Sequence, residues 1–420
     1  MINFKKITAT VLAFSCIVAT GCSLSSSIKV SEQQDYKTIT FSWWGTDARN
    51  EYTLDAIKSF ERLHPNIKVE AKYGDWSGFE KRTKIEMASD TEADVMQINY
   101  AWISQFSPDG KTFYDLNKLS NIIDLSNFTK SELSSGYQNG KLQAIPIALN
   151  DMTFFYNKKT YKKYGLDIPK TLDDLYNEAK VMSKDNIFPM SCVSKSAWYF
   201  ATSIEEQRTH KRIFDKDNKL NFGKAEFSDM ISLTADLIKN KVIDDLSSYD
   251  KTKIYSGKYA GTLSWITDVP NTFANVDQDD FVVGDYILEN SNNDLEWYVK
   301  PATMYAINAN TENPDESALL LDFLLNSSEM AKKQGLEKGI PISQKAKKTL
   351  ESDNLLKGLQ WDAYEKMDEN YDQMKTSSPY FEETSIIEGF YDAVNRVLYK
   401  NESADSAASE FLKITNSIVK

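Results

Sequence analysis

The chain has 420 residues, of which 41% are hydrophobic and 26% are charged, and its formal net charge is −12. This length exceeds that of one ordinary core and predicts two domains, while the composition is that of a globular protein. The acidic balance argues against nucleic acid as a partner, because phosphate backbones are bound by basic surfaces.

The N-terminus carries a targeting signal. The basic start MINFKK is followed by the apolar run ITATVLAFSCIVAT and then by the small residues of Ala19-Thr20-Gly21 before Cys22. This order resembles a bacterial lipoprotein signal, which predicts a signal peptide at 1–21, lipid on Cys22 and a polar tether at 22–35. The alternative is an ordinary signal peptide cleaved nearby. Removal of Cys16 and lipidation of Cys22 leave only Cys192, so we expect no disulfide within the chain.

Residues 38–99 are expected to form strand, helix, strand, helix and strand. The stretch TITFSWW alternates two faces, so Trp43 lies with the core residues and Trp44 points the other way. The following segment places Leu54, Ile57 and Phe60 on one helical stripe. Strands that alternate with helices predict a mostly parallel sheet covered on both faces.

Later segments continue the α/β pattern. Residues 140–157 (GKLQAIPIALNDMTFFYN) read as two short strands around a turn. Thr171 and Asp174 have the spacing of a capping box at a helix start, and Asn313 with Pro314 predicts the start of another helix. The last ~70 residues are expected to be all helical, from their helical spacing of apolar residues.

Five stretches, in this order, carry a family resemblance: FSWWGTDARNEYTLDAIKSFERLHPNIKVEAKYGDWSGFEKR, ADVMQINYAWISQFSPDGKTFYDLNKL, GKLQAIPIALNDMTFFYNKKTYKKYGLDIPKTLDDL, YSGKYAGTLSWITDVPN and NPDESALLLDFLLNS. They resemble the family 1 extracellular solute-binding proteins of ABC importers, the group that includes maltose-binding protein. Each stretch alone is a weak signal, but their order and spacing together are a strong one. The five stretches run over nearly the whole chain after the tether.

The resemblance implies an α/β, two-lobed periplasmic-binding-protein-like fold with a ligand cleft between the lobes and a helical C-terminal segment. The first lobe is expected at 36–147 plus 302–345, and the second at 151–300 plus 350–420. Ligand binding is expected to close a hinge between the lobes. The same resemblance implies an oligosaccharide as ligand, ABC permease subunits in the membrane as partners, and a monomer anchored by lipid on the extracellular face of the cell membrane.

Within the family, the chain is similar to the branch that binds oligogalacturonides and other oligosaccharides. That branch tends to carry an arginine where this chain has Asn150-Asp151-Met152. An arginine pairs well with a uronate carboxylate, whereas an aspartate suits neutral hydroxyls. We therefore expect a neutral oligosaccharide.

A sugar site needs flat aromatic platforms for the C–H faces of the ring and polar groups for its hydroxyls. Such sites lie beyond strand ends and between domains. Asp47 has a second interpretation as a helix cap, and Trp43 is expected in the core. The residues expected to contact the ligand are Trp44, Gly45, Asp47, Arg49, Trp76, Asn99, Trp102, Asp151, Trp198, Trp265, Asp268 and Tyr305.

Three alternatives remain: an oligouronide-binding or a peptide-binding importer protein, and a surface glycoside hydrolase. A hydrolase needs two carboxylates at a fixed separation, and no hydrolase signature surrounds any acid pair. His64 and His210 are the only histidines, which makes a zinc site or a histidine-based triad unexpected. We expect no enzyme activity and no cofactor or metal.

Overall fold

The computed structural model describes residues 36–419, and residues 36–420 form one compact unit by contact. The expected signal peptide, the lipid site Cys22 and the tether lie outside the described residues. The fold is mixed α/β and two-lobed, as expected. Among the described residues, no helix is both long and apolar enough to serve as a membrane span.

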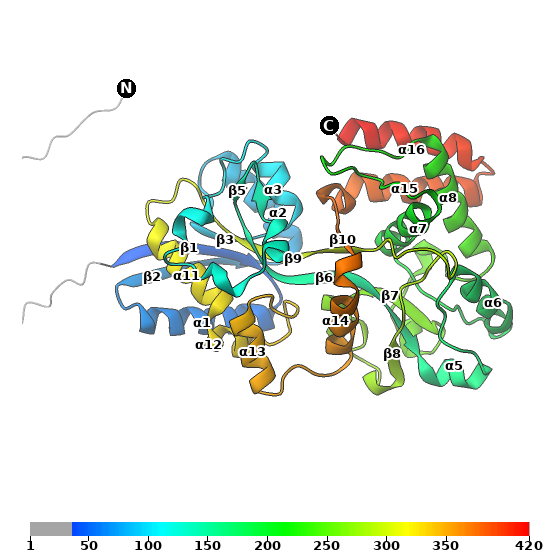
Figure 1. Cartoon of the computed structure of the whole chain (residues 1–420), viewed down its shortest axis with the longest axis horizontal. Coiled ribbons are helices and arrows are strands. Elements are labelled where there is room, and N and C mark those ends of the chain that lie inside the picture. The colour runs from blue at the N-terminus through cyan, green and yellow to red at the C-terminus, as the bar shows by residue number, and fades with distance from the viewer. Residues whose placement is uncertain (1–35, 420) are drawn as a thin grey trace, which may run out of the picture. The chain divides into compact units, whose positions relative to one another are not determined.

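The first lobe begins as predicted, with strand, helix, strand, helix and strand. β1 pairs in parallel with β2 on one side and with β3 on the other. The helices α11, α12 and α13 return to this lobe late in the chain, where α11 and α12 pack on α1 (Figure 1). Its elements are β1 (Lys37–Trp44), α1 (Asp47–Leu63), β2 (Ile67–Gly74), α2 (Trp76–Ala88), β3 (Val95–Ile98), α3 (Ala101–Phe106), α4 (Lys130–Ser134), β4 (Tyr137–Gln138), β5 (Lys141–Leu142), α11 (Pro314–Asn326), α12 (Ser328–Gln334) and α13 (Gln344–Ser352).

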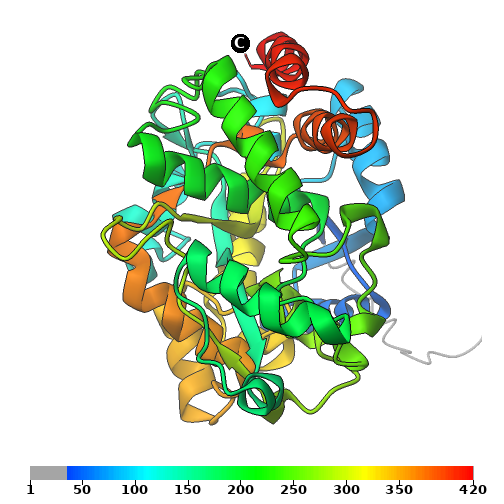
Figure 2. The ribbon, with the colours of Figure 1, turned by 90° about the vertical axis from the view of Figure 1, so that its right-hand side faces the viewer.

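The second lobe is mostly helical, with three short strands of its own. α15 and α16 lie beside α8 at the top of the lobe, as Figure 2 shows end-on. Its elements are α5 (Lys158–Tyr164), α6 (Leu172–Met182), α7 (Ser194–Thr209), α8 (Lys224–Lys239), α9 (Thr252–Tyr255), β7 (Gly261–Trp265), α10 (Val269–Thr272), β8 (Phe281–Val283), α14 (Leu359–Asn370), β10 (Lys375–Thr376), α15 (Thr384–Tyr399) and α16 (Ala404–Ile418). The exact boundaries expected for the two lobes stay predictions.

Two strands belong to both lobes: β6 (Ile145–Asn157) and β9 (Tyr298–Ile307). The strand order is β2-β1-β3-β9-β6-β7, so the sheet runs without a break from the first lobe to the second. β1, β2 and β3 are mutually parallel, whereas β9 is antiparallel to both β3 and β6 and pairs in parallel with the two-residue β10. The expectation of a mostly parallel sheet therefore holds for residues 37–98 and not beyond.

Residues 140–157 hold two strands, as expected, but only the first of them, β5, is short. β6 is one strand of 13 residues, of which the first 12 are buried. Asn150 and Asp151 lie in the middle of β6, where their polar groups find partners. The Asn150 side chain donates to the Thr267 hydroxyl at 3.0 Å, and Asp151 accepts from the hydroxyls of Thr153 and Tyr286.

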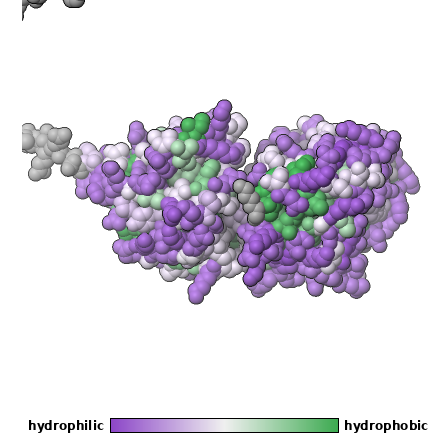
Figure 3. All heavy atoms as spheres, turned by 90° about the horizontal axis from the view of Figure 1, so that it is seen from above, coloured by the Kyte–Doolittle hydropathy of each residue, from purple (hydrophilic) through white to green (hydrophobic). Residues whose placement is uncertain are grey.

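Several local predictions are confirmed. Thr171 and Asp174 form a capping box at the start of α6. Pro314 is the first residue of α11, although the Asn313 side chain makes no capping bond. The C-terminal segment is helical apart from the two-residue strand β10. Hydrophilic residues cover most of the face seen from above, and apolar residues gather mainly on the right-hand lobe (Figure 3).

The buried carboxyl of Asp151 makes stability depend on pH. Burial raises its pKa to about 7, against about 3.9 in the unfolded chain. Since the folded pKa is the higher one, this contribution is fully present below pH 4 and is lost as pH rises through 7. Relative to Asp151→Asn, the parent should lose up to roughly 4 kcal/mol of unfolding free energy between pH 4 and pH 8. Urea unfolding of both proteins across that range measures it, and parallel curves would contradict the assignment.

Candidate functional site

Three tryptophans form one wall of the candidate site in the first lobe. Trp44 ends β1, Trp76 begins α2 and Trp102 lies in α3, so all three follow the carboxyl ends of adjacent parallel strands. The Trp76 ring packs edge-on against Trp44 at a centroid distance of 4.9 Å and stacks on Trp102 at 5.9 Å. The strand-end rule therefore brought these three predicted residues together.

Exposure separates the roles of the three rings. Trp44 is 9% exposed and Trp102 is 2% exposed, whereas Trp76 is 41% exposed. Trp43 and Trp44 point to opposite sides of β1, as predicted, but both are buried. The exposed platform of this wall is consequently Trp76, with Trp44 and Trp102 as its support.

A cavity of about 320 Å³ lies against this wall and is bounded by residues of both lobes. We call it the tryptophan cavity. Asn99 lines it and holds its own turn, because its Oδ1 accepts the Ala101 N–H at 3.0 Å. Gln105 donates to Glu383 at 3.3 Å, a direct bond between the lobes. The lining residues are Trp76, Glu80, Lys84, Asn99, Ala101, Trp102, Gln105, Lys195, Glu382, Glu383 and Thr384.

The facing wall is organised by Glu382, which sequence reasoning missed. Its carboxylate accepts hydrogen bonds from Lys195 Nζ and from the Tyr199 hydroxyl, each at 2.8 Å, and lies 3.5 Å from Lys300 Nζ. Burial alone raises the pKa of Glu382, but Lys300 and Lys195 outweigh it and hold that pKa at about 2. Glu382 is thus an ionised, buried carboxylate that fixes two ammonium groups.

Two predicted residues border this charged group. Lys300 Nζ lies 4.6 Å from the centre of the Trp265 ring, which is half-buried at the end of β7. Asp268 follows three residues later and is exposed at the surface. Partial desolvation of its carboxyl by the surrounding protein raises its pKa, while Lys300 and Lys195 act against that rise. The predicted pair therefore lies with Lys195, Lys300 and Glu382 on the second-lobe side.

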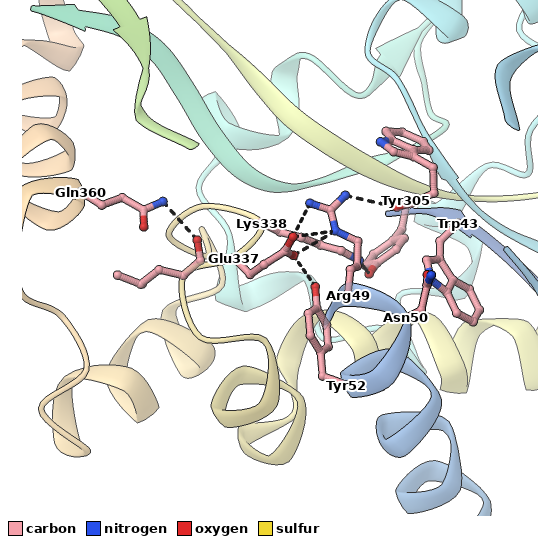
Figure 4. Close-up of polar contacts among 10 residues, drawn as sticks. Trp43, Arg49, Asn50, Tyr52, Tyr305, Glu337, Lys338 and Gln360 are labelled. Carbon is pink, nitrogen blue, oxygen red and sulfur yellow. Dashed lines mark hydrogen bonds and ion pairs between the residues drawn. The ribbon is translucent and has the colours of Figure 1, made fainter. Parts of the chain in front are cut away.

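Arg49 has a partner within the chain, the carboxylate of Glu337. Its Nε and Nη2 donate to Glu337 Oε1 at 3.0 and 2.8 Å, and Tyr52 donates to the same carboxylate at 2.6 Å (Figure 4). Gly45 is required beside it, since a Cβ there would lie 2.2 Å from Arg49 Cδ. Tyr305 is fully buried and accepts from Lys338 Nζ at 2.8 Å.

The expectations that Trp198 and Asp151 contact the ligand need correction, because both side chains are buried. Trp198 is not in a loop: it lies in α7, is 0% exposed and packs against Phe390 at 5.3 Å between ring centres. Asp151 is also 0% exposed, because its partners are Thr153 and Tyr286. The charge argument for a neutral ligand that rested on Asp151 is thereby lost. Asp47 is exposed and begins α1 without any side-chain capping bond from the preceding residue.

Metal-binding side chains do not gather within residues 36–419: no group of three or more His, Cys, Asp or Glu residues there could hold an ion. The chemistry of the site is that of aromatic contact and charge-assisted hydrogen bonding. It can hold a polar ligand with apolar faces between the two lobes.

The chain belongs to the family of bacterial extracellular solute-binding proteins, whose pattern matches residues 43–331. It is similar to an uncharacterized ABC transporter extracellular-binding protein of Pyrococcus horikoshii, with 25% identity over 202 residues that cover 45% of this chain and 44% of that one. It is also similar to the melibiose/raffinose/stachyose-binding protein MelE of Bacillus subtilis, with 25% identity covering 49% of this chain and 47% of MelE. These curated matches span less than half the length of each relative.

Among solved structures, the chain is similar to a periplasmic oligogalacturonide binding protein from Yersinia enterocolitica in complex with saturated digalacturonic acid. The two chains are 31% identical with a TM-score of 0.81, over 91% of this chain and 98% of that one. The likeness covers both lobes, and it confirms the expected family and fold.

Glu382→Gln tests the charged wall. Because the folded pKa of Glu382 lies below its unfolded value of about 4.3, its stabilisation is present above pH 4.3 and is lost as pH falls toward 2. The variant should be less stable than the parent at pH 7 by about 3 kcal/mol, and this difference should shrink steadily between pH 5 and pH 3. Chemical unfolding at each pH measures it. A difference that is the same at all pH values would show that Glu382 does not carry the charge described.

Proposed function

We propose that this protein captures an oligosaccharide between its two lobes and delivers it to an ABC importer. The observation that carries the proposal is the tryptophan cavity, in which an exposed indole face from one lobe meets ordered charged groups from the other. An aromatic face binds the C–H side of a sugar ring, and charge-assisted donors bind its hydroxyls. The relatives in Bacillus subtilis and Yersinia enterocolitica are, by their names, proteins that bind such molecules.

A neutral oligosaccharide suits the tryptophan cavity better than a polyuronide. Its lining contains three acids and two lysines, in which Lys84 pairs with Glu80 and Lys195 with Glu382. The lining side chains therefore carry one acid in excess, Glu383, while Lys300 lies behind Glu382 and does not line the cavity. A carboxylate-bearing ring would meet a net negative lining there. This charge balance replaces Asp151 as the argument for a neutral ligand.

The importer partner and the anchor belong to the proposal as well. The ABC transporter assignment is supported by the similarity to the Pyrococcus horikoshii protein and by the family resemblance of the sequence. Lipidation of Cys22 is supported by the basic, apolar and small-residue order of 1–22. We propose a lipid-anchored monomer on the extracellular face of the cell membrane, whose lobes close on the ligand.

The hydrolase alternative is disfavoured by the pKa of Glu382, the acid of the cavity lining that both Lys195 and Lys300 contact. A glycosidase needs a general acid whose pKa is raised, so that it is protonated at working pH. Glu382 has its pKa at about 2 and is held by two lysines. It is suited to orienting donors and unsuited to giving up a proton.

The proposal is tested by a binding screen with protein lacking residues 1–22. Thermal shift and tryptophan fluorescence are measured with raffinose, stachyose and maltotriose, with oligogalacturonides, and with peptides. A ligand that binds only the folded state raises the melting temperature by mass action. Binding to peptides and to no saccharide, or release of reducing ends from a polysaccharide, would overturn the assignment.

Trp76→Ala should weaken binding of the saccharide found in that screen by at least about 30-fold, which is the effect of losing a contact worth about 2 kcal/mol. Ile85→Ala is the matched control, because Ile85 is a large apolar residue on the same helix, is 60% exposed and does not line the cavity. In isothermal titration calorimetry, Ile85→Ala should bind the saccharide with the same affinity as the parent protein. Equal affinities for the two variants would show that Trp76 is not the platform.

A further inference from the structure

A second cavity, of about 420 Å³, lies next to the tryptophan cavity. We call it the arginine cavity. Tyr100 lines it from the first lobe, and all its other lining residues come from the second lobe. They are Arg212, Phe214, Asp215, Lys216, Asn218, Tyr298, Thr376, Ser377, Ser378 and Phe381.

The same two segments border both cavities. Tyr100 of the arginine cavity stands between Asn99 and Ala101 of the tryptophan cavity, and Phe381 directly precedes Glu382. These segments touch where α3 packs on the 3-10 helix Pro379–Glu382. The two cavities are therefore adjacent parts of one cleft, separated by a contact between the lobes.

Arg212 is the main polar feature of the arginine cavity. Its side chain is 35% exposed, and its guanidinium carbon lies 5.3 Å from the centre of the Tyr298 ring. The buried Glu206 carboxylate forms an ion pair with Arg212 at 3.8 Å from Nε, without a hydrogen bond, so the guanidinium keeps its N–H groups for another acceptor. Glu206 Oε1 instead accepts the Ile213 N–H at 2.7 Å, which fixes the loop that carries Arg212.

The remaining charges of the lining add to a positive site. Lys216 is a second cation, and Asp215 is the one acid of the lining. The Asp215 carboxylate is engaged in its own turn, where Oδ1 accepts the N–H groups of Asp217 and Lys219, each at 2.9 Å. The arginine cavity thus has one lining cation in excess, whereas the tryptophan cavity has one lining acid in excess.

Aromatic rings form the apolar part of the arginine cavity. Phe381 packs against Tyr298 at 4.5 Å and against Phe214 at 5.6 Å between ring centres. A planar guanidinium pairs with a carboxylate through two parallel hydrogen bonds, and aromatic rings suit the faces of a sugar. The combination fits a ring that carries a carboxylate.

We propose that the arginine cavity binds one acidic sugar residue, a hexuronate, at the end of an otherwise neutral oligosaccharide that occupies the tryptophan cavity. Arg212 pairs with the carboxylate, and Tyr298 with Phe381 contacts the ring. This inference rests on the proposed function, since it assigns the two ends of the ligand to two parts of the same cleft. It makes Arg212 a determinant of specificity that the sequence pattern did not single out.

The test uses single sugars, so that it does not depend on knowing the whole ligand. Saturation-transfer NMR is recorded for D-glucuronate and D-galacturonate, with D-glucose and D-galactose as uncharged counterparts. At least one of the uronates should bind, and at least tenfold more tightly than its hexose. Arg212→Gln should lower the affinity for that uronate at least tenfold. Arg212→Lys, which keeps the positive charge, should lower it less.

Arg208→Gln is the matched control. Arg208 lies at the end of α7, is 32% exposed, pairs with Glu289 at 3.0 Å and does not line either cavity. Arg208→Gln should bind the uronate as the parent does. Uronates that bind no better than hexoses, or a uronate response unchanged by Arg212→Gln, would overturn the inference. Failure of the saccharide screen and of Trp76→Ala would instead overturn the proposed function, so the two failures are distinguishable.

Discussion

The ladder between β6 and β9 is the constraint on which the rest of the structure depends. Ile145 to Asp151 of β6 pair with Tyr305 to Val299 of β9, and both strands continue beyond this ladder into further pairings on either side. A strand that is buried along its length cannot shift register without moving every side chain to the opposite face. This pairing therefore fixes where the site residues of both lobes lie relative to the shared strands.

The site residues follow from that ladder. Lys300 and Tyr305 lie on β9, and Trp265 pairs with Met152 on β6. The charged groups around the cleft are then matched within the protein: Arg49 with Glu337, and Lys195 and Lys300 with Glu382. Matched charges are ordered before any ligand arrives, which lowers the cost of binding. In this account the ligand gains its contacts from the Trp76 face and from donors that are already oriented.

Local patterns in the sequence predicted much of the fold. The two-residue alternation of TITFSWW separated Trp43 from Trp44, and Thr171 with Asp174 predicted a helix start that the structure confirms. The wrong assignments have one physical cause, which is that a partner distant in sequence decides the outcome. Tyr286 satisfies Asp151 in the middle of β6, and Phe390 with Phe411 buries Trp198.

The same limit applies to the site. Strand ends bring Trp76, Asn99 and Trp102 to one cavity, because parallel strands deliver their carboxyl ends to one edge. Glu337 is 288 residues from Arg49, and Glu382 is 187 residues from Lys195, so no local spacing could reveal these pairs. The aromatic pair Tyr380-Phe381 is the one local feature of the sequence that marks the segment of Glu382.

Closure of the two lobes on a saccharide is the central claim of this account. It is tested most directly by electron-electron distance measurement between spin labels at Ile85 of α2 and Tyr399 of α15, both of which are exposed, while the native Cys192 is buried. We predict that a saturating oligosaccharide shortens and narrows the distance distribution between the labels. An unchanged distribution with bound saccharide would contradict the claim.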